Sequence, residues 1–504
     1  MKIGERLNIC ANWVANGLAF VMLSFLMIIS VLYYSDGYQL NFNAGRGIVQ
    51  WIVGGVSLLA VWWIIGKLTE KSKGVQITLI VILFSIAVFF CAWWIKNSAN
   101  LPQSDEKSIY DIALRAKNHD LLPIAPKGSY MSLWPFQAGL VLFEEIILRI
   151  MPRADEMTIQ WFYIPLMAIS LISAYMVVHK MFHSFKSDML WCILMLLYFP
   201  YYFYVNNMYG EVPSMAFMFF SLWMLLEWLE KTGKVYFILC GISMAGAVAV
   251  RKNVLIYGIA VALILFILWV KEQKKRYIAI ILLMIISVLV GTYVPRFFYE
   301  YRAHNTMGEG VPAMAYIAMG LQWDEGRAAG SWNGYNSDVY MECDYDRQLT
   351  VELSKKSIEE SLDYFSGNIG YAFKFYYNKL VEQWAREDAS CLYSTLEFYG
   401  DRTQSAWSIY QGKAKDVIMY IMSVQQMLII MGAIFWCILN RKRCSRIENL
   451  ILLVTFIGGF LFSMLWEASA RYVLPYYIAI IPYAADGYRG IFEKTEFMKK
   501  VNLG

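Results

Sequence analysis

The chain has 504 residues, of which 59% are hydrophobic and only 16% are charged, and its mean hydropathy is +0.44. Soluble domains carry about a quarter charged residues, so this composition excludes an ordinary water-soluble protein. The net charge of +5 is small and scattered along the chain, which argues against a nucleic-acid-binding protein.

Long apolar runs recur along the whole chain. Several approach or exceed the roughly 18 apolar residues that a helix needs to cross a bilayer, and none alternates in polarity as barrel strands do. We therefore predict an all-α polytopic membrane protein with about 12 transmembrane helices. The predicted spans are 12–34, 48–67, 75–95, 157–179, 188–205, 209–229, 235–250, 253–271, 277–297, 416–440, 447–466 and 470–488.

Lysine and arginine are concentrated in every second short loop. They are Lys67, Lys71, Lys73, Lys180, Lys186, Lys231, Lys234, Lys271, Lys274, Lys275, Arg276, Arg441, Lys442, Arg443 and Arg446. Because basic loops stay in the cytoplasm, this pattern predicts a multi-pass protein of the cell membrane with both termini cytoplasmic.

Two segments on the predicted outer side are too long to be turns. The first, 96–156, contains a stretch of helical spacing at 107–117 and an apolar stretch at 133–150 that also carries charges. A span at 133–150 would invert the side of every later loop, so we predict that it is an interfacial helix lying along the outer surface.

The second outer segment, 298–415, contains a stretch rich in Gly, Trp and Asn at 319–340, followed by predicted helices at 347–365 and near 368–386. We predict a small outer-face cap. The resulting organisation has three parts: a transmembrane bundle at 1–297, which includes the outer loop 96–156 with a candidate catalytic carboxylate, the cap at 298–415, and C-terminal transmembrane helices at 416–504.

Ionisable residues are nearly absent from the middle of the spans and gather at their outer ends. A cation or proton transporter would place carboxylates near the midplane, so the pattern indicates chemistry at the outer membrane–water boundary. The candidates are Asp105, Glu106, Glu211, Arg251, Lys252, Glu467 and Arg471.

Each candidate also has a plainer interpretation. Asp105 could be a general base toward a hydroxyl, or Ser104, Asp105 and Glu106 could cap the helix that follows. Arg251 and Arg471 could bind a phosphate or extend toward lipid headgroups. Glu211 could favour a helix N-terminus, and Glu467 could pair with Arg471 at helical spacing. The residues alone leave these alternatives open.

Several short motifs occur in a recognisable order. They are the acidic pair after Ser104, YMSLWPFQAGL from Tyr130, YGEVPS from Tyr209, VRKN from Val250, a Gly/Trp/Asn motif around Trp332, and WEASARYVLP from Trp466. In this arrangement the chain resembles bacterial membrane glycosyltransferases of the GT-C superfamily, most closely the family 39, protein-mannosyltransferase-like members.

The resemblance implies an inverting glycosyltransferase that moves a sugar from a polyprenyl-phosphate carrier to a glycan or other envelope acceptor on the outer face. Asp105 would be the general base, Arg251 and Arg471 would bind the leaving phosphate, with Lys252 as a third cation, and Glu106, Glu211 and Glu467 would line the pocket. Trp323, Trp332 and Tyr335 could stack on sugars or simply pack the cap on the bundle. No cofactor is predicted; a divalent metal among Asp105, Glu106 and Glu211 is conceivable but not indicated.

Other classes of function remain compatible with the residues. A lipid-linked saccharide polymerase or ligase, a flippase, or a non-enzymatic envelope assembly protein would share the membrane topology. Cys343 and Cys391, the two cysteines predicted outside the membrane, could form a disulfide in an oxidising compartment; the sequence gives no distance between them.

Overall fold

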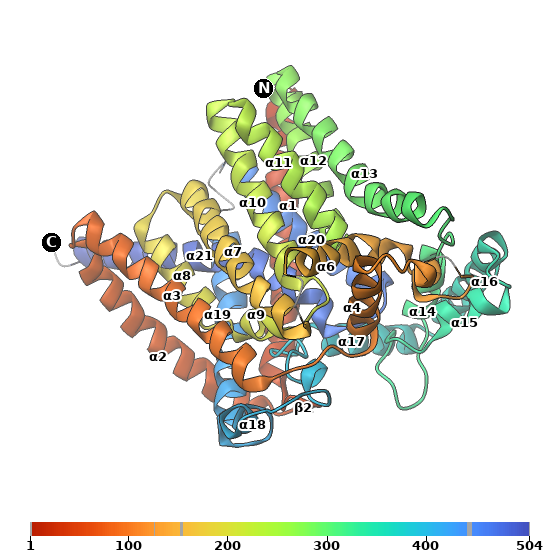
Figure 1. Ribbon diagram of the computed structural model, residues 1–504. Coiled ribbons are helices and arrows are strands. Elements are labelled where there is room, and N and C mark those ends of the chain that lie inside the picture. Colours follow the sequence, from red (N-terminus) through yellow and green to blue (C-terminus); the bar gives the residue numbers. More distant parts are fainter. Residues whose placement is uncertain (1–2, 125, 152–154, 441–445, 503–504) are drawn as a thin grey trace.

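The computed structural model describes residues 3–124, 126–151, 155–440 and 446–502 (Figure 1). These residues are mostly helical, which confirms the prediction of an all-α polytopic membrane protein. One antiparallel hairpin, β1 (Tyr33–Ser35) and β2 (Leu40–Phe42), joins the first two long helices. No strand was predicted in this part of the chain.

In the described part of the chain, nine helices are long and apolar enough to cross a membrane, or ten if one bent pair counts as a single span. The nine are α1 (Ile3–Leu32), α2 (Ala44–Thr69), α3 (Lys73–Ser98), α7 (Glu156–Phe182), α10 (Glu211–Lys231), α12 (Leu255–Glu272), α13 (Lys275–Ala303), α19 (Lys413–Asn440) and α20 (Ile451–Leu465).

Three further helical segments coincide with predicted spans. The bent pair is α8 (Phe185–Leu196) and α9 (Phe199–Phe203), which meet at 55° where Pro200 enters the second helix. Helix α11 (Lys234–Val250) is shorter than the others, and α21 (Leu474–Asn502) carries Asp486 and Arg489. Every predicted span therefore corresponds to a helix or a helix pair, but the number of twelve crossings stays a prediction.

Small residues let the long helices approach one another closely. A Cβ added at Gly487 of α21 would lie 2.0 Å from the Gly432 carbonyl oxygen of α19, and one added at Gly291 of α13 would lie 2.3 Å from the Ala245 oxygen of α11. Close backbone contact of this kind drives helix association in a membrane, where the hydrophobic effect between helices is absent.

The first outer segment contains α4 (Ser104–Lys117), η1 (Leu122–Ile124), α5 (Tyr130–Leu133), η2 (Pro135–Gln137) and α6 (Ala138–Ile150). Helix α6 has 13 residues, about 20 Å in length, too short to cross a bilayer. It runs across the end of α11, where Gly139 abuts the Ala249 carbonyl (Figure 1). The helix predicted over 133–150 is thus continuous only from Ala138, and its position along the outer surface of the membrane stays a prediction.

One buried carboxylate joins the first outer segment to α13. Glu145 of α6 pairs with Arg149 at 2.7 Å and with Arg302 of α13 at 2.9 Å, and it accepts a hydrogen bond of 2.6 Å from the Tyr299 hydroxyl. Both guanidinium groups also donate to the Ala116 carbonyl at the end of α4. We call these residues the Glu145 clamp; it fixes the end of α4 against α6 and α13.

The cap contains α14 (Ala313–Gly320), α15 (Tyr335–Glu342), α16 (Arg347–Gly367) and α17 (Ile369–Trp384), followed by η5 (Tyr393–Thr395) and α18 (Gln404–Gln411). The two helices predicted in this segment are thus present as α16 and α17. The cap is attached to the C-terminal part of the chain by a backbone bridge between Ser331 and Ala468, whose N–H donates to the Gly330 carbonyl at 2.7 Å.

The structure contradicts the possible disulfide between Cys343 and Cys391. Cys343 and Cys391 are both free and buried. Cys343 packs with Leu133 and Tyr340 in a small cluster between α5 and the cap, whereas Cys391 belongs to the main core.

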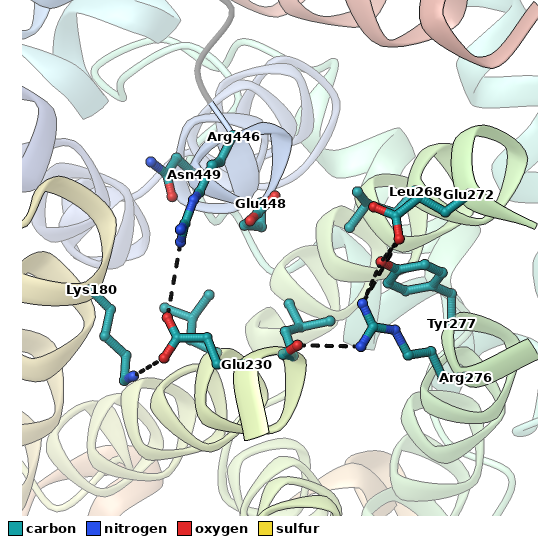
Figure 2. A pocket seen from close by; sticks show the side chains of 11 residues that line it. Lys180, Glu230, Leu268, Glu272, Arg276, Tyr277, Arg446, Glu448 and Asn449 are labelled. Atoms are coloured by element: carbon teal, nitrogen blue, oxygen red, sulfur yellow. Dashed lines mark hydrogen bonds and ion pairs between the residues drawn. The ribbon is translucent and has the colours of Figure 1, made fainter. Parts of the chain in front are cut away.

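Three of the loops predicted to be cytoplasmic meet at one end of the bundle. Lys180, Arg276 and Arg446 line a pocket of about 270 Å³, in which Glu230 pairs with Lys180 at 2.7 Å and with Arg446 at 4.0 Å (Figure 2). These loops therefore share one face, as the charge pattern predicted. Arg441, Lys442 and Arg443, which contributed to that prediction, lie outside the described residues.

Candidate active site at the start of α10

The candidate site lies at the end of the bundle opposite to the pocket of Figure 2. Helix α10 begins with Glu211 at the site and reaches Glu230, which lines that pocket, in its last turn. The catalytic candidates are consequently on the other face of the membrane from the basic loops, which is the outer face if those loops are cytoplasmic.

Asp105 is the second residue of α4 and is half-buried. Gln103, rather than Ser104 or Asp105, occupies the N-cap position, and its side chain makes no capping bond. The Asp105 carboxylate instead accepts a hydrogen bond from the Tyr209 hydroxyl at 3.0 Å and also hydrogen-bonds with Tyr130. The Asp105 side chain therefore makes no capping bond, although Asp105 and Glu106 lie in the first turn of α4; it is held instead by two phenol groups, one from α5 and one from the turn before α10.

Tyr209 connects the parts of the site, and sequence analysis did not select it. Its hydroxyl accepts from Gln137 Nε2 at 2.7 Å, and its carbonyl accepts from Arg251 at 2.7 Å. The Arg471 guanidinium lies 4.6 Å from the centre of its ring. The glycine of the YGEVPS motif could have indicated a turn here. Gly210 has φ +88, a conformation that glycine adopts without strain, and it separates Tyr209 from the first residue of α10.

Glu211 brings the two predicted phosphate-binding arginines together. Its carboxylate lies 2.8 Å from Arg251 and 3.6 Å from Arg471, and its side chain is only 2% exposed. A buried carboxylate between two guanidinium groups orients both of them. Arg471 is the more accessible, with 23% of its side chain exposed against 9% for Arg251.

Two further carboxyl groups are buried near this cluster. Burial, together with the neighbouring Glu211, raises the pKa of Glu106 to about 8 against the opposing effect of Arg471. Burial also raises the pKa of Glu467 to about 7, although Arg471 and the Tyr472 hydroxyl favour its ionised form. Glu106 is therefore mostly protonated at pH 7, and Glu467 is divided between its two forms.

Glu467 does not pair with Arg471 at helical spacing. Helix α20 ends at Leu465, Trp466 has an extended conformation, and the short helix η7 (Ala470–Val473) begins only after Glu467. The Glu467 carboxylate accepts instead from the Tyr472 hydroxyl at 3.4 Å.

Lys252 is directed away from the other cations: its ammonium group contacts the Gly291 carbonyl of α13 at 3.4 Å.

Trp323 packs against Tyr371 and Phe375 inside the cap, which supports the packing interpretation for this residue.

The other two aromatic candidates also belong to the cap. Tyr335 borders the cluster that contains Tyr340, and Trp332 is 54% exposed. Where the cap meets the site, the stacked aromatic pair is Tyr316 and Trp466, with ring centres 4.8 Å apart. Sequence analysis had not proposed either of these two rings.

Lys379 of α17 is a buried cation that sequence analysis missed. Its ammonium group donates to the Gly320 carbonyl, and burial lowers its pKa to about 7 against the opposing effect of Glu467.

As for metals, no group of three His, Cys, Asp or Glu side chains within the described residues is arranged to hold an ion.

A family model for dolichyl-phosphate-mannose-protein mannosyltransferases matches residues 140–291. The matched segment runs from α6 to α13 and includes Glu211, Arg251 and Lys252, while Asp105 and Arg471 lie outside it.

A crystal structure of the oligosaccharyltransferase from Archaeoglobus fulgidus in the apo form matches with a TM-score of 0.48 and 12% identity, over 86% of this chain and 52% of that one. This chain thus spans about half the length of the archaeal protein. No curated protein matches the chain. Over residues 140–291 of this polytopic membrane protein, the family match agrees with the resemblance to GT-C glycosyltransferases predicted from the motifs.

Proposed function

We propose that the chain transfers a sugar from a polyprenyl-phosphate carrier to an acceptor hydroxyl on the outer face of the cell membrane, with inversion at the anomeric carbon. The observation that carries this proposal is the cluster at the start of α10, in which Asp105 and Arg471 both contact Tyr209 while Glu211 pairs with Arg251 and lies close to Arg471. Tyr209 therefore contacts both the proposed base and one of the two cations that we propose bind the phosphate.

The acceptor oxygen attacks the anomeric carbon while its proton passes to Asp105. The bond between the anomeric carbon and the phosphate oxygen breaks, and the phosphate leaves with the electron pair. Negative charge then develops on the phosphate, and preorganised cations stabilise such charge most effectively where water is excluded. Arg471 and Arg251 supply these cations, with Arg471 the more accessible of the two.

Asp105 is the better base of the acidic pair on α4. Glu106 is 7% exposed, and its pKa of about 8 leaves it mostly protonated at pH 7, so it has little capacity to take another proton. Asp105 is half-buried and oriented by Tyr209 and Tyr130. Fixing the carboxylate in this way lowers the cost of reaching the reactive geometry.

The test uses the full chain in nanodiscs with radiolabelled undecaprenyl-phosphate sugars and isolated envelope glycans. Asp105→Asn should lower transfer by a factor of about 10² to 10⁴, the usual contribution of a general base, without changing donor binding. The matched control is Asp111→Asn, on the same helix but paired with Lys107 at the surface, which should transfer normally.

Arg471→Ala should weaken donor binding as well as transfer, because its guanidinium is assigned to the phosphate. Near-normal transfer by Asp105→Asn would refute the assignment of the base and leave Glu106 or Glu211 as the candidate. Undecaprenyl-diphosphate donors serve as a comparison: transfer only from these would indicate a ligase or polymerase instead.

A further inference from the structure

A second pocket lies between the first outer segment and the cap. It has a volume of about 560 Å³, within the range of about 300 to 1,000 Å³ typical of sites for small organic ligands. Its walls come from three parts of the chain: Lys127 and Ser132 of the first outer segment, the stretch 305–309 after α13, and cap residues of the range 340–348.

We propose that this pocket binds a neutral saccharide, a unit of the acceptor glycan at a distance from the hydroxyl to be glycosylated. The proposal rests on the function proposed above for Asp105. It assigns a ligand class to a pocket whose residues do not overlap those of the candidate active site.

The lining favours a hydroxyl-rich ligand. Asn305, Thr306, Gln348 and Ser132 offer amide and hydroxyl groups that both donate and accept hydrogen bonds. Met307 is the single aliphatic side chain in the described lining, and it is only 3% exposed. Tyr340 and Tyr345 add aromatic surface, so the lining offers apolar contacts as well as hydrogen-bond partners for sugar hydroxyls.

The charges of the lining argue for a neutral ligand. Lys127 and Arg347 supply two positive charges, and Glu309 and Asp346 supply two negative charges. The cations are also engaged within the protein: Lys127 pairs with Asp344 at 2.7 Å, and Arg347 donates to the Glu309 carbonyl at 2.9 Å. A phosphorylated or strongly acidic ligand would have no excess of positive charge to bind.

Two glycines allow the walls of the pocket to approach each other closely. Gly128 has φ +81, and a Cβ there would lie 2.5 Å from the Tyr345 hydroxyl; a Cβ at Gly308 would lie 2.6 Å from the Ser132 carbonyl oxygen. The ring of Tyr345 is half-buried and borders the pocket beneath the Lys127 ammonium group. An aromatic face beside polar groups is suited to a sugar ring, which has apolar C–H faces and polar edges.

Helix α5 links the pocket to the proposed base. Ser132 lines the pocket, and Tyr130, two residues earlier in the same turn of helix, hydrogen-bonds with Asp105. Side chains two positions apart on a helix point to different sides of it, so α5 lies between a saccharide in the pocket and Asp105.

The experiment measures binding of the full chain in nanodiscs to an array of neutral, amino and acidic oligosaccharides, with no donor present. Thr306→Trp should fill the pocket, and Asn305→Ala should remove a polar partner; each should reduce binding of a neutral saccharide at least tenfold. Glu359→Trp is the matched control, because Glu359 is exposed on α16 away from the pocket, and it should bind normally.

Binding is measured apart from transfer, so failure of the proposed chemistry leaves this test intact. Absence of binding to any neutral saccharide would overturn the proposal, as would binding that Thr306→Trp and Asn305→Ala leave unchanged. If transfer is active, Asn305→Ala should raise the KM for the acceptor at least tenfold with the donor KM unchanged; a normal acceptor KM would also overturn it.

Discussion

The buried carboxyl group of Glu106 should make the stability of the protein depend on pH. Burial, together with the nearby Glu211, raises its pKa from 4.5 to about 8. A folded state that holds a proton more tightly than the unfolded chain is stabilised below the unfolded pKa and loses that stability as the pH rises through the folded pKa. The free energy of unfolding should thus decrease between about pH 4.5 and pH 8.

The magnitude follows from the shift. A change of about 3.5 units at roughly 1.4 kcal/mol per unit corresponds to about 5 kcal/mol over this interval, as an upper bound for one group. Glu106→Gln keeps the size of the side chain but cannot ionise. It should therefore be more stable than the unmodified protein at pH 8 to 9 and similar to it near pH 5.

The assay is the apparent Tm of the full chain in nanodiscs, followed by tryptophan fluorescence from pH 5 to pH 9. Glu467 is still present in Glu106→Gln, and its pKa is raised to about 7. The variant should therefore keep a smaller decrease in Tm, at lower pH than the decrease caused by Glu106. Glu359→Gln, at an exposed position, should keep the full pH dependence. If Glu106→Gln has the same pH dependence as the unmodified protein, burial of Glu106 imposes no cost on its ionised form and the reasoning fails.

Three other outcomes follow from the contacts. Tyr209→Phe should lower transfer by a factor of about 10 to 150, the value of a hydrogen bond of about 1.5 to 3 kcal/mol to a charged group. Tyr201→Phe, which loses a buried hydroxyl bond to Ser170 of α7, should lower only thermal stability; equal activities of the two variants would contradict this. Glu145→Gln should destabilise the protein by about 3 to 5 kcal/mol, because it removes the negative partner of a buried ion pair and leaves the cations unpaired. An unchanged denaturation midpoint would show that the Glu145 clamp contributes nothing to stability. In intact cells, a membrane-impermeant maleimide should label Ser104→Cys but not Lys234→Cys, and the reverse pattern would invert the topology.

The membrane bundle could be predicted from the sequence because apolar length and loop charge are local properties of the chain. The hairpin at 33–42 has strands of three residues each, too short to show a pattern of alternation. The bend between α8 and α9 could be suspected from Pro200, but its angle of 55° depends on the packing around it.

The candidate site was predicted in part, since charges at span ends are conspicuous in an apolar chain. Their partners were not, because they depend on local backbone conformation. Arg251 is extended, with φ −152 and ψ 120, whereas Lys252 begins the short helix η4 (Lys252–Val254). The backbone thus changes conformation between the two cations, and Arg251 pairs with Glu211 while Lys252 contacts the Gly291 carbonyl. Tyr209 is one of 35 tyrosines, and nothing in its composition sets it apart.

The Glu145 clamp has a consequence for the order in which the protein can be completed. Arg302, which donates to the Ala116 carbonyl, follows that residue by 186 positions in the chain. During synthesis from the N-terminus, α4 and α6 emerge long before the cation that fastens them together. The segment that carries Asp105 therefore cannot reach its final arrangement until α13 has been synthesised and inserted. A nascent chain that ends before Arg302 lacks part of the support for that segment.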